Sequence, residues 1–401
     1  MGLKLNITAT SLLLLLASAA EVACDTIFYV TKYGERADGN TDISQALLKA
    51  WGDACSSPVA STVMTPDGTY ALGQITIGGP CKAPINFIVQ GTVKAPMDTR
   101  RFKAEAGWIA FQQIDQFTLS GGGVFDGQGK TVWGTKCPSS AYCNQLPILS
   151  SCIYMLMFNF ITNSMVKDIT SRDSKQFHIN LLGCKNLTFY NVVISAPEES
   201  LNTDGIHIGR SSGINITDST IETGDDCVSI GDGSEQINMQ RVTCGPGHGI
   251  SVGSLGKYPN EEPVVGISVK NRTLTNTQNG VRVKTWPASH QGTAYEMHFE
   301  DIVMNNVGNP IIIDQEHCPH NQCNLKIPSR IKLSSVSFRN IRGTTSTQVA
   351  VKLVCSQGVP CEDVELGDIN LKYKGNEGHA MSQCKTIKPN LLGTQLPRTR
   401  A

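Results

Sequence analysis

The sequence predicts an all-β protein, a single-stranded right-handed parallel β-helix in which each coil of the chain stacks on the one before. Two short apolar phrases recur along the chain, no helical pattern separates their copies, and 38 glycines and 18 prolines supply many turns. A coil of this kind cannot bury its apolar face alone, so stacked coils build one continuous core. A β-sandwich is the main alternative, but it explains the in-phase repetition less well.

The first phrase alternates apolar and polar residues and then places Asp or Asn, with Arg241 as the one exception, before a residue that is apolar in five of the seven copies. Its copies begin at Leu187, Ile214, Ile237, Ile267, Met297, Val336 and Val364, about 23 to 39 residues apart. The second phrase lies between them, as Ile206-His207-Ile208, Val228-Ser229-Ile230, Ile250-Ser251-Val252, Val281-Arg282-Val283 and Ile311-Ile312-Ile313. Alternation with a period of two predicts strands, and the variable spacing places the additional residues in loops at the corners.

The two ends of the chain differ from this pattern. Residues 1–20 combine one lysine, a short apolar run and small residues, which predicts a secretory signal peptide. Residues 42–51, DISQALLKAW, have helical spacing and are expected to form a short N-terminal helix that caps the solenoid. We expect one domain over residues 21–390 and a loosely ordered tail over residues 391–401.

Composition narrows the function classes and the compartment. The 401 residues carry a net charge of zero, so nothing attracts the chain to nucleic acid or an anionic membrane. No later segment is apolar enough for a membrane helix, which indicates a secreted, extracellular protein, most simply a monomer. The sequons at Asn186, Asn215 and Asn271 are candidate N-glycosylation sites.

The 14 cysteines all lie from Cys24 onward, and in an oxidising compartment they indicate disulfides rather than metal ligands. Close spacing suggests loop-closing pairs, and one further pair could link adjacent segments. These candidates are Cys137 with Cys143, Cys318 with Cys323, Cys355 with Cys361, and Cys227 with Cys244.

Charged residues cluster around the second phrase. If the coils stack in register, Asp204, Asp226 and His248 occupy one position in three successive coils, about 4.8 Å apart. Asp225 is one residue out of this row and needs a local bend to join it. Turns at the corners of the coils could also explain these aspartates, because Asp side chains readily hydrogen-bond to nearby backbone groups.

Two cations are expected on the same outer wall. Arg282 aligns with His207, Ser229 and Ser251, which alternate with buried residues and so point outward, and Lys284 follows two residues later. Three carboxylates, a histidine and two cations converging on one face favour a catalytic cleft over a set of turns. Clustered carboxylates also raise one another's pKa, as a general acid requires.

Four motifs carry a resemblance. Asn202-Thr203-Asp204, Gly224-Asp225-Asp226, Gly247-His248-Gly249 and Arg282-Val283-Lys284 resemble, in order and spacing, the polygalacturonases, which are pectin-degrading glycoside hydrolases with a right-handed parallel β-helix. The resemblance covers nearly all of the mature chain. The wording CGPGHGISVGSLGKY and NGVRVKTWP is most similar to the pollen-type exopolygalacturonases of plants, which implies a cell-wall location.

The resemblance implies hydrolysis of the α-1,4 bonds of polygalacturonic acid with inversion, in exo fashion and without a cofactor. It assigns Asp225 as the general acid and Asp204 and Asp226 as the groups that activate water. Inversion is typical of carboxyl groups about 6.5–9.5 Å apart. The resemblance also places His248 beside the acid.

The remaining motif residues are expected to bind substrate. Arg282 and Lys284 suit the galacturonate carboxylate, and Asn202 is expected to contact sugar or orient Asp204. One position departs from the family, because His317 stands where the family has a tyrosine that binds substrate. A histidine there is expected to change charge near pH 6 and to alter affinity or the pH profile.

Four alternatives stay open. An endo-polygalacturonase differs only in its loops, for which residues 252–281 and 314–331 are the candidate walls. A pectate lyase would bind Ca²⁺ through Asp204, Asp225 and Asp226. A rhamnogalacturonan hydrolase is disfavoured by the Arg-x-Lys motif. A protein of another class, a catalytically silent solenoid that binds cell-wall polysaccharide, would keep the fold without the chemistry.

Overall fold

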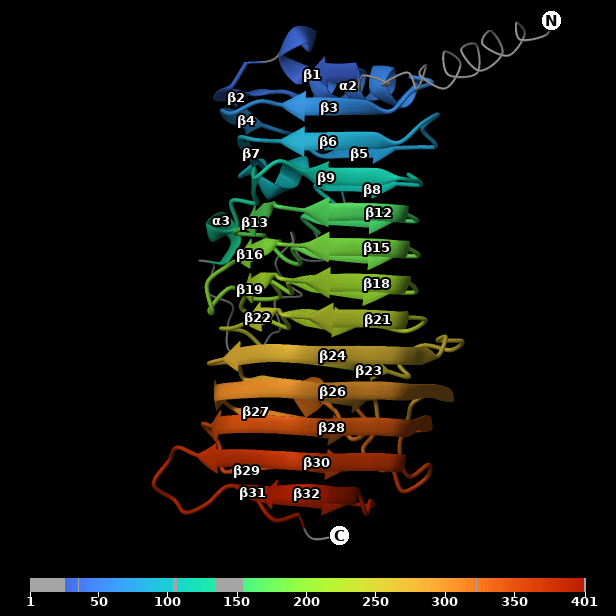
Figure 1. Cartoon of the computed structure of the whole chain (residues 1–401), viewed down its shortest axis with the longest axis vertical. Helices are drawn as coiled ribbons and strands as arrows, with labels where there is room; N and C mark the ends of the chain where they lie inside the picture. Colours follow the sequence, from blue (N-terminus) through green and yellow to red (C-terminus); the bar gives the residue numbers. More distant parts are fainter. Residues whose placement is uncertain (1–25, 35, 104–106, 134–153, 322, 400–401) are drawn as a thin grey trace, which may run out of the picture.

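A computed structural model describes residues 26–34, 36–103, 107–133, 154–321 and 323–399. The predicted parallel β-helix is confirmed: successive coils stack along one long axis, and the paired strands run parallel (Figure 1). The predicted signal peptide lies outside the described residues. In the part of the chain that is described, no helix combines the length and apolar character needed to cross a membrane.

Each coil contributes strands to three faces. The first face consists of β5 Ile75–Gly78, β8 Ile109–Gln112, β11 Leu156–Asn159, β14 Ile179–Leu182, β17 Ile206–Gly209, β20 Val228–Ile230, β23 Ile250–Leu255, β25 Asn279–Thr285, β27 Asn309–Asp314, β29 Val349–Val354 and β31 Met381–Lys385. The second face consists of β1 Thr26–Tyr29, β3 Ser61–Thr65, β6 Ile85–Val89, β9 Phe117–Ser120, β12 Thr162–Lys167, β15 Lys185–Tyr190, β18 Ser212–Thr217, β21 Glu235–Gln240, β24 Val264–Thr275, β26 Gly292–Val307, β28 Ile331–Thr345, β30 Glu362–Tyr373 and β32 Asn390–Leu396. The third face consists of β2 Asp38–Asp42, β4 Thr69–Ala71, β7 Thr92–Lys94, β10 Val124–Asp126, β13 Thr170–Arg172, β16 Val193–Ser195, β19 Thr220–Glu222 and β22 Thr243–Cys244.

The corner between the second and third faces explains the first sequence phrase. At this corner one residue of each coil adopts the left-handed conformation, with φ between 48° and 55°, and these residues are Asn191, Asp218, Arg241, Asn271, Asp301, Asn340 and Asp368. Asn and Asp tolerate this conformation better than other residues with a side chain. The strands β24, β26, β28 and β30 continue through the corner and pair on both faces.

The core runs the length of the solenoid. The second phrase supplies one of its internal rows, in which Ile206, Val228, Ile250, Val281 and Ile311 align coil upon coil and are each at most 1% exposed. Burying each such side chain stabilises the fold by about 1.5–3 kcal/mol, so the stack is the main favourable contribution to stability.

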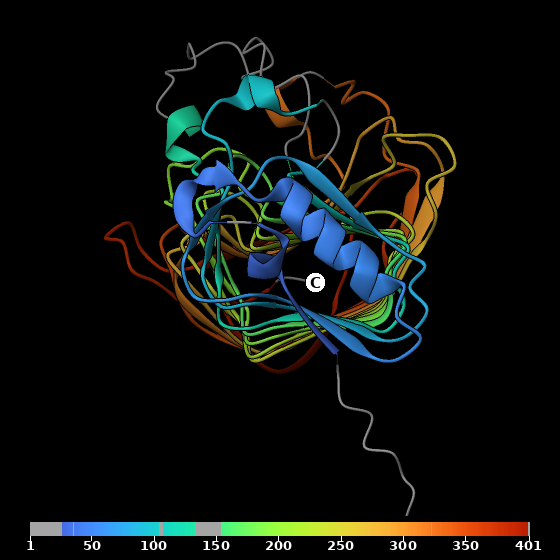
Figure 2. The same ribbon diagram turned by 90° about the horizontal axis from the view of Figure 1, so that it is seen from above.

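The expected N-terminal capping helix is present as α2 Ser44–Cys55, which lies across the end of the solenoid (Figure 2). Asp42 accepts a hydrogen bond of 2.9 Å from the Ser44 backbone N–H at its start. Its buried face includes Leu47 and Trp51, whose indole N–H donates to the Gly78 carbonyl at 2.9 Å. A disulfide between Cys55 and Cys81, absent from the sequence expectations, joins the helix to the coil beneath it.

The short helices occupy loops. They are α3 Lys130–Trp133 and the 3₁₀ turns η1 Val30–Tyr33, η2 Thr99–Arg101 and η3 Pro319–Asn321. The expected loose tail is wrong for residues 391–396, which belong to β32. This strand pairs with β30, and Leu391 packs against the core. The last full coil offers an unpaired edge, and its backbone groups are satisfied by one more strand.

Three of the four expected cysteine pairs form disulfides, namely Cys227–Cys244, Cys318–Cys323 and Cys355–Cys361. Cys137 and Cys143 lie outside the described residues. Of the sequon residues, Asn186 and Asn271 are exposed and Asn215 is half-buried on β18, so glycosylation stays a prediction.

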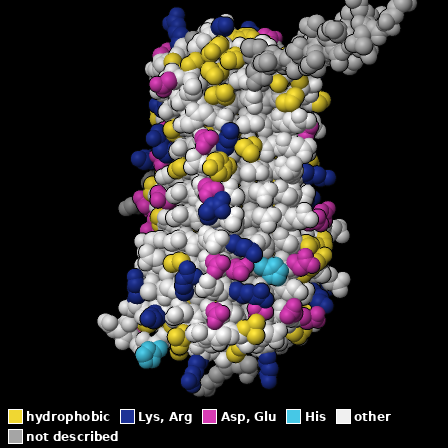
Figure 3. Space-filling view, viewed as in Figure 1, with side chains coloured by type: hydrophobic (Ala, Val, Ile, Leu, Met, Phe, Trp, Pro, Cys, Tyr) yellow, Lys and Arg dark blue, Asp and Glu magenta, His cyan; other side chains and the backbone are white. Residues whose placement is uncertain are grey.

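The outer surface of the second face carries charges of both signs. Lys270 pairs with Glu300 at 2.9 Å, and Arg339 pairs with Glu365 at 2.5 Å. Figure 3 shows basic and acidic side chains interspersed across this face. Such exposed pairs contribute little to stability and present no single-sign field to a partner.

Arg272 is the exception to this arrangement, because its side chain points into the core and is 2% exposed. Its three guanidinium nitrogens have no hydrogen-bond partner among the described residues, and burial is the main cause that lowers its pKa to about 9. We expect Arg272→Met to stabilise the fold by about 1–3 kcal/mol, because it removes a desolvated, unpaired polar group. Thermal and urea unfolding would measure this.

The matched control is Arg241→Met, which removes an exposed guanidinium that is paired with Asp218. It should change stability by less than about 1 kcal/mol. A lower melting temperature for Arg272→Met would show that the guanidinium has a stabilising partner in solution.

Candidate active site

The expected site residues come together where the third face turns into the first. Asp204 lies just before β17, Asp225 and Asp226 before β20, and His248 before β23. The strands that follow are in the expected register, since His207, Ser229, Ser251 and Arg282 align in successive coils. Backbone hydrogen bonds extend this register into the loops, and the Gly205 N–H donates to the Asp226 carbonyl at 2.9 Å.

The glycines of the Gly-His-Gly motif allow close approach of neighbouring coils. Gly249 has φ +86°, and a Cβ there would lie 2.1 Å from the Asn279 carbonyl oxygen. The His248 backbone N–H donates to the Asp225 carbonyl at 2.7 Å. The disulfide between Cys227 and Cys244 holds the same turn from the other side. The local sequence thereby orients His248 towards Asp225.

Asp226 lies at the centre of the site and is 3% exposed. One carboxylate oxygen accepts from Arg282 Nη2 and Ser251 Oγ, both at 2.9 Å, and the other lies 3.2 Å from Lys284 Nζ. Burial acts to raise the pKa of Asp226, but Lys284, Arg282 and the Ser251 hydrogen bond outweigh it and hold the pKa below its ordinary value. Asp226 is therefore ionised.

Asp204 has the opposite environment. It is 6% exposed, and the Ser229 hydroxyl donates a hydrogen bond of 2.9 Å to its carboxyl group. Burial, followed by the charges of Asp225 and Asp226, raises the pKa of Asp204 well above its ordinary value. Two neighbouring carboxyl groups with pKa values shifted in opposite directions are typical of an acid–base site.

His207 extends this network. Its Nδ1 lies 2.8 Å from Ser229 Oγ. While Ser229 donates its hydrogen to Asp204, Nδ1 of His207 carries the hydrogen that it donates to Ser229. Burial lowers the pKa of His207 to about 4, so the ring is neutral. Ser229, Ser251 and His207 thus orient the carboxylates, a role that sequence reasoning missed although it placed them on this wall.

Asp225 is the most accessible of the three carboxyl groups, with 25% of its side chain exposed. One oxygen lies 2.9 Å from His248 Nδ1 and accepts from the Asp226 backbone N–H at 2.8 Å. Ligand atoms of Asp225, Asp226 and His248 all lie within 4.8 Å of one another. One oxygen of Asp225 thus lies closer to one oxygen of Asp226 than the 6.5–9.5 Å that is typical of the two carboxyl groups of an inverting enzyme.

His317 belongs to the same region but not with the charge expected of it. It lies in the insert that follows β27, and burial, then the charges of Lys284 and Arg282, lowers its pKa to about 4. The expected change of charge near pH 6 is wrong, because burial, and then two nearby cations, disfavour the protonated ring. Its ring meets Trp286 edge to face, with centroids 6.3 Å apart.

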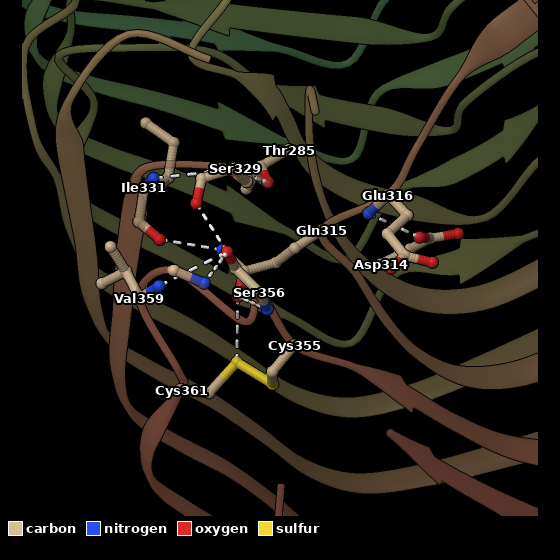
Figure 4. Close-up of a disulfide and its surroundings, with 11 residues drawn as sticks. Thr285, Asp314, Gln315, Glu316, Ser329, Ile331, Cys355, Ser356, Val359 and Cys361 are labelled. Carbon is tan, nitrogen blue, oxygen red and sulfur yellow. Dashed lines mark hydrogen bonds between the residues drawn. A yellow bond between two sulfur atoms is a disulfide. The ribbon is translucent and has the colours of Figure 1, made fainter. Parts of the chain in front are cut away.

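The base of this insert is held by Gln315, which is fully buried. Its amide donates to the Ile331 carbonyl at 2.8 Å and accepts from the Ser356 backbone N–H at 2.9 Å, next to the Cys355–Cys361 disulfide (Figure 4). Asn202, the remaining candidate, is half-buried two residues before Asp204, with φ 54°. Arg282 and Lys284, each with 13% of the side chain exposed, contact Asp226 directly.

Comparison with known proteins agrees with this arrangement. A polygalacturonase of Nicotiana tabacum is 53% identical over 397 residues, covering 99% of this chain and 97% of that protein. An exopolygalacturonase of Oenothera organensis is 56% identical over 357 residues, covering 89% and 97%. The solved endo-xylogalacturonan hydrolase of Aspergillus tubingensis superposes with a TM-score of 0.79 at 23% identity, over 92% of this chain and 98% of that one, which supports the fold.

The family model described as glycosyl hydrolases family 28 matches residues 55–394, which include every candidate site residue named above. With the fold, the site and these relatives in agreement, the chain belongs to the glycosyl hydrolases of family 28.

Proposed function

We propose that the protein hydrolyses the α-1,4 bonds of polygalacturonic acid and acts from the chain end, releasing galacturonic acid. The observation that carries the proposal is the ionised Asp226, held by Arg282 and Lys284, directly beside the more exposed Asp225 and its partner His248. Exo action is supported by the name of the Oenothera relative. An endo-acting enzyme is the second candidate, because the Nicotiana relative is named a polygalacturonase without the exo qualifier.

In the proposed reaction Asp225 donates its proton to the glycosidic oxygen as the bond to the anomeric carbon breaks. A water molecule forms the new bond from the opposite side and gives its proton to Asp226, with Asp204 positioning that water. Asp225 suits the acid role because its Oδ1 is occupied by His248 and the Asp226 N–H, which leaves Oδ2 to carry the proton.

We propose inversion despite the short carboxyl separation. Retention requires a carboxylate that attacks the anomeric carbon itself. Asp226 is 3% exposed and both of its oxygens are engaged by cations, which makes it a poor nucleophile but leaves it able to accept a proton from water. The first product released should therefore be the β-anomer, and NMR during early turnover would detect it. Early α-anomer would show retention.

A calcium-dependent lyase is disfavoured by the donor set. Asp225, Asp226 and His248 are close enough to share a metal ion, but Arg282 and Lys284 already neutralise Asp226 and would repel a dication. A solenoid that only binds cell-wall polysaccharide would not require two neighbouring carboxyl groups whose pKa values are shifted in opposite directions.

One time course separates these functions. Polygalacturonic acid is incubated with the protein and EDTA while reducing ends, viscosity and chromatographic products are followed together. Monogalacturonate with little loss of viscosity is expected. A rapid fall in viscosity with mixed oligomers would indicate endo action, unsaturated products absorbing in the ultraviolet would indicate a lyase, and no new reducing ends across acidic pH would leave the silent binder.

The neutral His317 leads to a prediction about pH. Its lowered pKa of about 4 means that it does not titrate between pH 5 and 7, so His317→Tyr should leave the shape of the kcat/KM profile unchanged there. We expect KM for oligogalacturonates to change by about two- to tenfold, because the side chain adjoins the binding cations. A shift of the profile within that window would show that His317 is charged at working pH.

The compartment and assembly state belong to the same proposal. We propose an exported protein that acts as a monomer on cell-wall pectin. Four disulfides among the described residues fit an oxidising compartment. Mass measurement of the protein secreted from plant cells would test export, cleavage near residue 20 and glycosylation at Asn186, Asn215 or Asn271.

A further inference from the structure

A cluster of aromatic and basic side chains lies beyond Lys284 and takes no part in the chemistry described above. It consists of Lys257 and Tyr258 in the loop after β23, and Trp286 in the loop after β25. Lys257 Nζ lies 5.2 Å from the centroid of the Tyr258 ring and 5.6 Å from that of Trp286. We call these three residues the Lys257 cluster.

The Lys257 cluster is continuous with the site. Trp286 lies two residues after Lys284 and so projects from the same side of the strand end. Its ring contacts His317, whose pKa is lowered by burial and then by the charges of Lys284 and Arg282. A path of neighbouring side chains therefore leads from the catalytic Asp226 through Lys284 and His317 to the cluster.

The loop that carries Lys257 is held in one shape before any ligand binds. The two oxygens of Glu261 accept from the backbone N–H groups of Gly256 at 2.6 Å and Tyr258 at 2.9 Å. Backbone hydrogen bonds of 2.9 Å from Trp286 to Leu255, and from His290 to Gly256, join the loop to the next coil. A preformed surface loses less conformational entropy when a ligand binds.

The chemistry of the cluster fits an acidic sugar. Lys257 is exposed and has no carboxylate within ion-pair distance among the described residues, so its charge is available to a ligand. Tyr258 is 60% exposed, so its ring is accessible to a ligand as well as to Lys257. A pyranose ring offers C–H groups that pack on an aromatic face, and a uronate adds a carboxylate for the ammonium.

We propose that the Lys257 cluster is an additional sugar subsite, which binds the galacturonate unit next to the one contacted by Lys284. This inference rests on the proposed function and extends it to substrate length. A dimer spans the two positions that flank the broken bond and does not reach the cluster, whereas a trimer does. The subsite therefore favours substrates of three or more units.

The test compares digalacturonate with trigalacturonate for Lys257→Met, which removes the charge but keeps the alkyl stem, and for Tyr258→Ala. Each is expected to lower kcat/KM for the trimer by about three- to tenfold and to leave the dimer unchanged within twofold. The control is Lys332→Met, an exposed lysine paired with Glu362 on the second face, which should change neither substrate. Equal effects on both substrates, or none on the trimer, would overturn the subsite.

A binding measurement separates failure of the subsite from failure of the proposed function. Trigalacturonate and digalacturonate are titrated into Asp225→Asn protein, with tryptophan fluorescence as the readout. Tighter binding of the trimer, abolished by Lys257→Met in the same background, is expected. If the parent hydrolyses neither oligomer, the proposed function fails, and equal affinity for both oligomers would still overturn the subsite independently.

Discussion

Asp225→Asn is expected to lower kcat on digalacturonate by about 10²- to 10⁴-fold, the usual contribution of a positioned general acid. The same variant should lose far less on a dinitrophenyl α-galacturonide, because that leaving group departs without protonation. The reason lies in the site: Asp225 is the most accessible of the three carboxyl groups, and His248 contacts only one of its two oxygens. Steady-state kinetics on both substrates would measure the difference.

Asp226→Asn is the matched control, because it removes the proposed base and leaves the acid in place. It should abolish turnover of both substrates, since an activated leaving group does not replace the activation of water. The comparison also tests a rival assignment that the raised pKa of Asp204 supports, in which Asp204 is the acid. If the dinitrophenyl substrate restores activity to Asp204→Asn but not to Asp225→Asn, the general acid is Asp204.

Asp204→Asn and Asp226→Asn are expected to change stability in opposite directions at pH 7. The raised pKa of Asp204 means that, above its ordinary value, the folded protein retains a proton that the unfolded chain releases. Stability therefore falls as pH rises from that value through the folded pKa, and an asparagine avoids the loss. Asp204→Asn should melt at a higher temperature than the parent at pH 7, with no such advantage at pH 3.

The lowered pKa of Asp226 has the reverse consequence. It stabilises the fold above the ordinary pKa of an aspartate, and this contribution is lost as pH falls through the folded value. Asparagine also leaves Arg282 and Lys284 without their counter-ion in a site where each side chain is 13% exposed. Breaking a buried pair in this way costs about 3–5 kcal/mol. Thermal melts of both variants at the two pH values test the contrast, and destabilisation of Asp204→Asn at pH 7 would contradict it.

Much of the fold follows from local pattern. Residues such as Ile206, Val228 and Ile250 alternate with outward residues, and alternation of this kind predicts both the strands and the face that each side chain takes. The left-handed corner follows from Asn191 and Asp218, which tolerate that conformation. Register alone then predicts that the aspartates, His248 and Arg282 meet on one wall.

Tertiary structure decided what depends on distant parts of the chain. The strand β32 forms because the preceding coil exposes an edge, and Cys55 meets Cys81 only once the helix lies on the first coils. Neither the strand β32 nor the Cys55–Cys81 disulfide can be predicted from the local sequence around those residues.

The protonation of the site is the clearest case. In the sequence, Asp204 and Asp226 are both aspartates, and they occupy equivalent positions in adjacent coils. The sequence by itself determined that they would be neighbours. Only the folded structure decided that Asp226 lies against two cations, which lower its pKa, while burial and the neighbouring carboxylates raise the pKa of Asp204. Burial and charge–charge distance set a pKa, and both are properties of three-dimensional surroundings that a residue type does not carry.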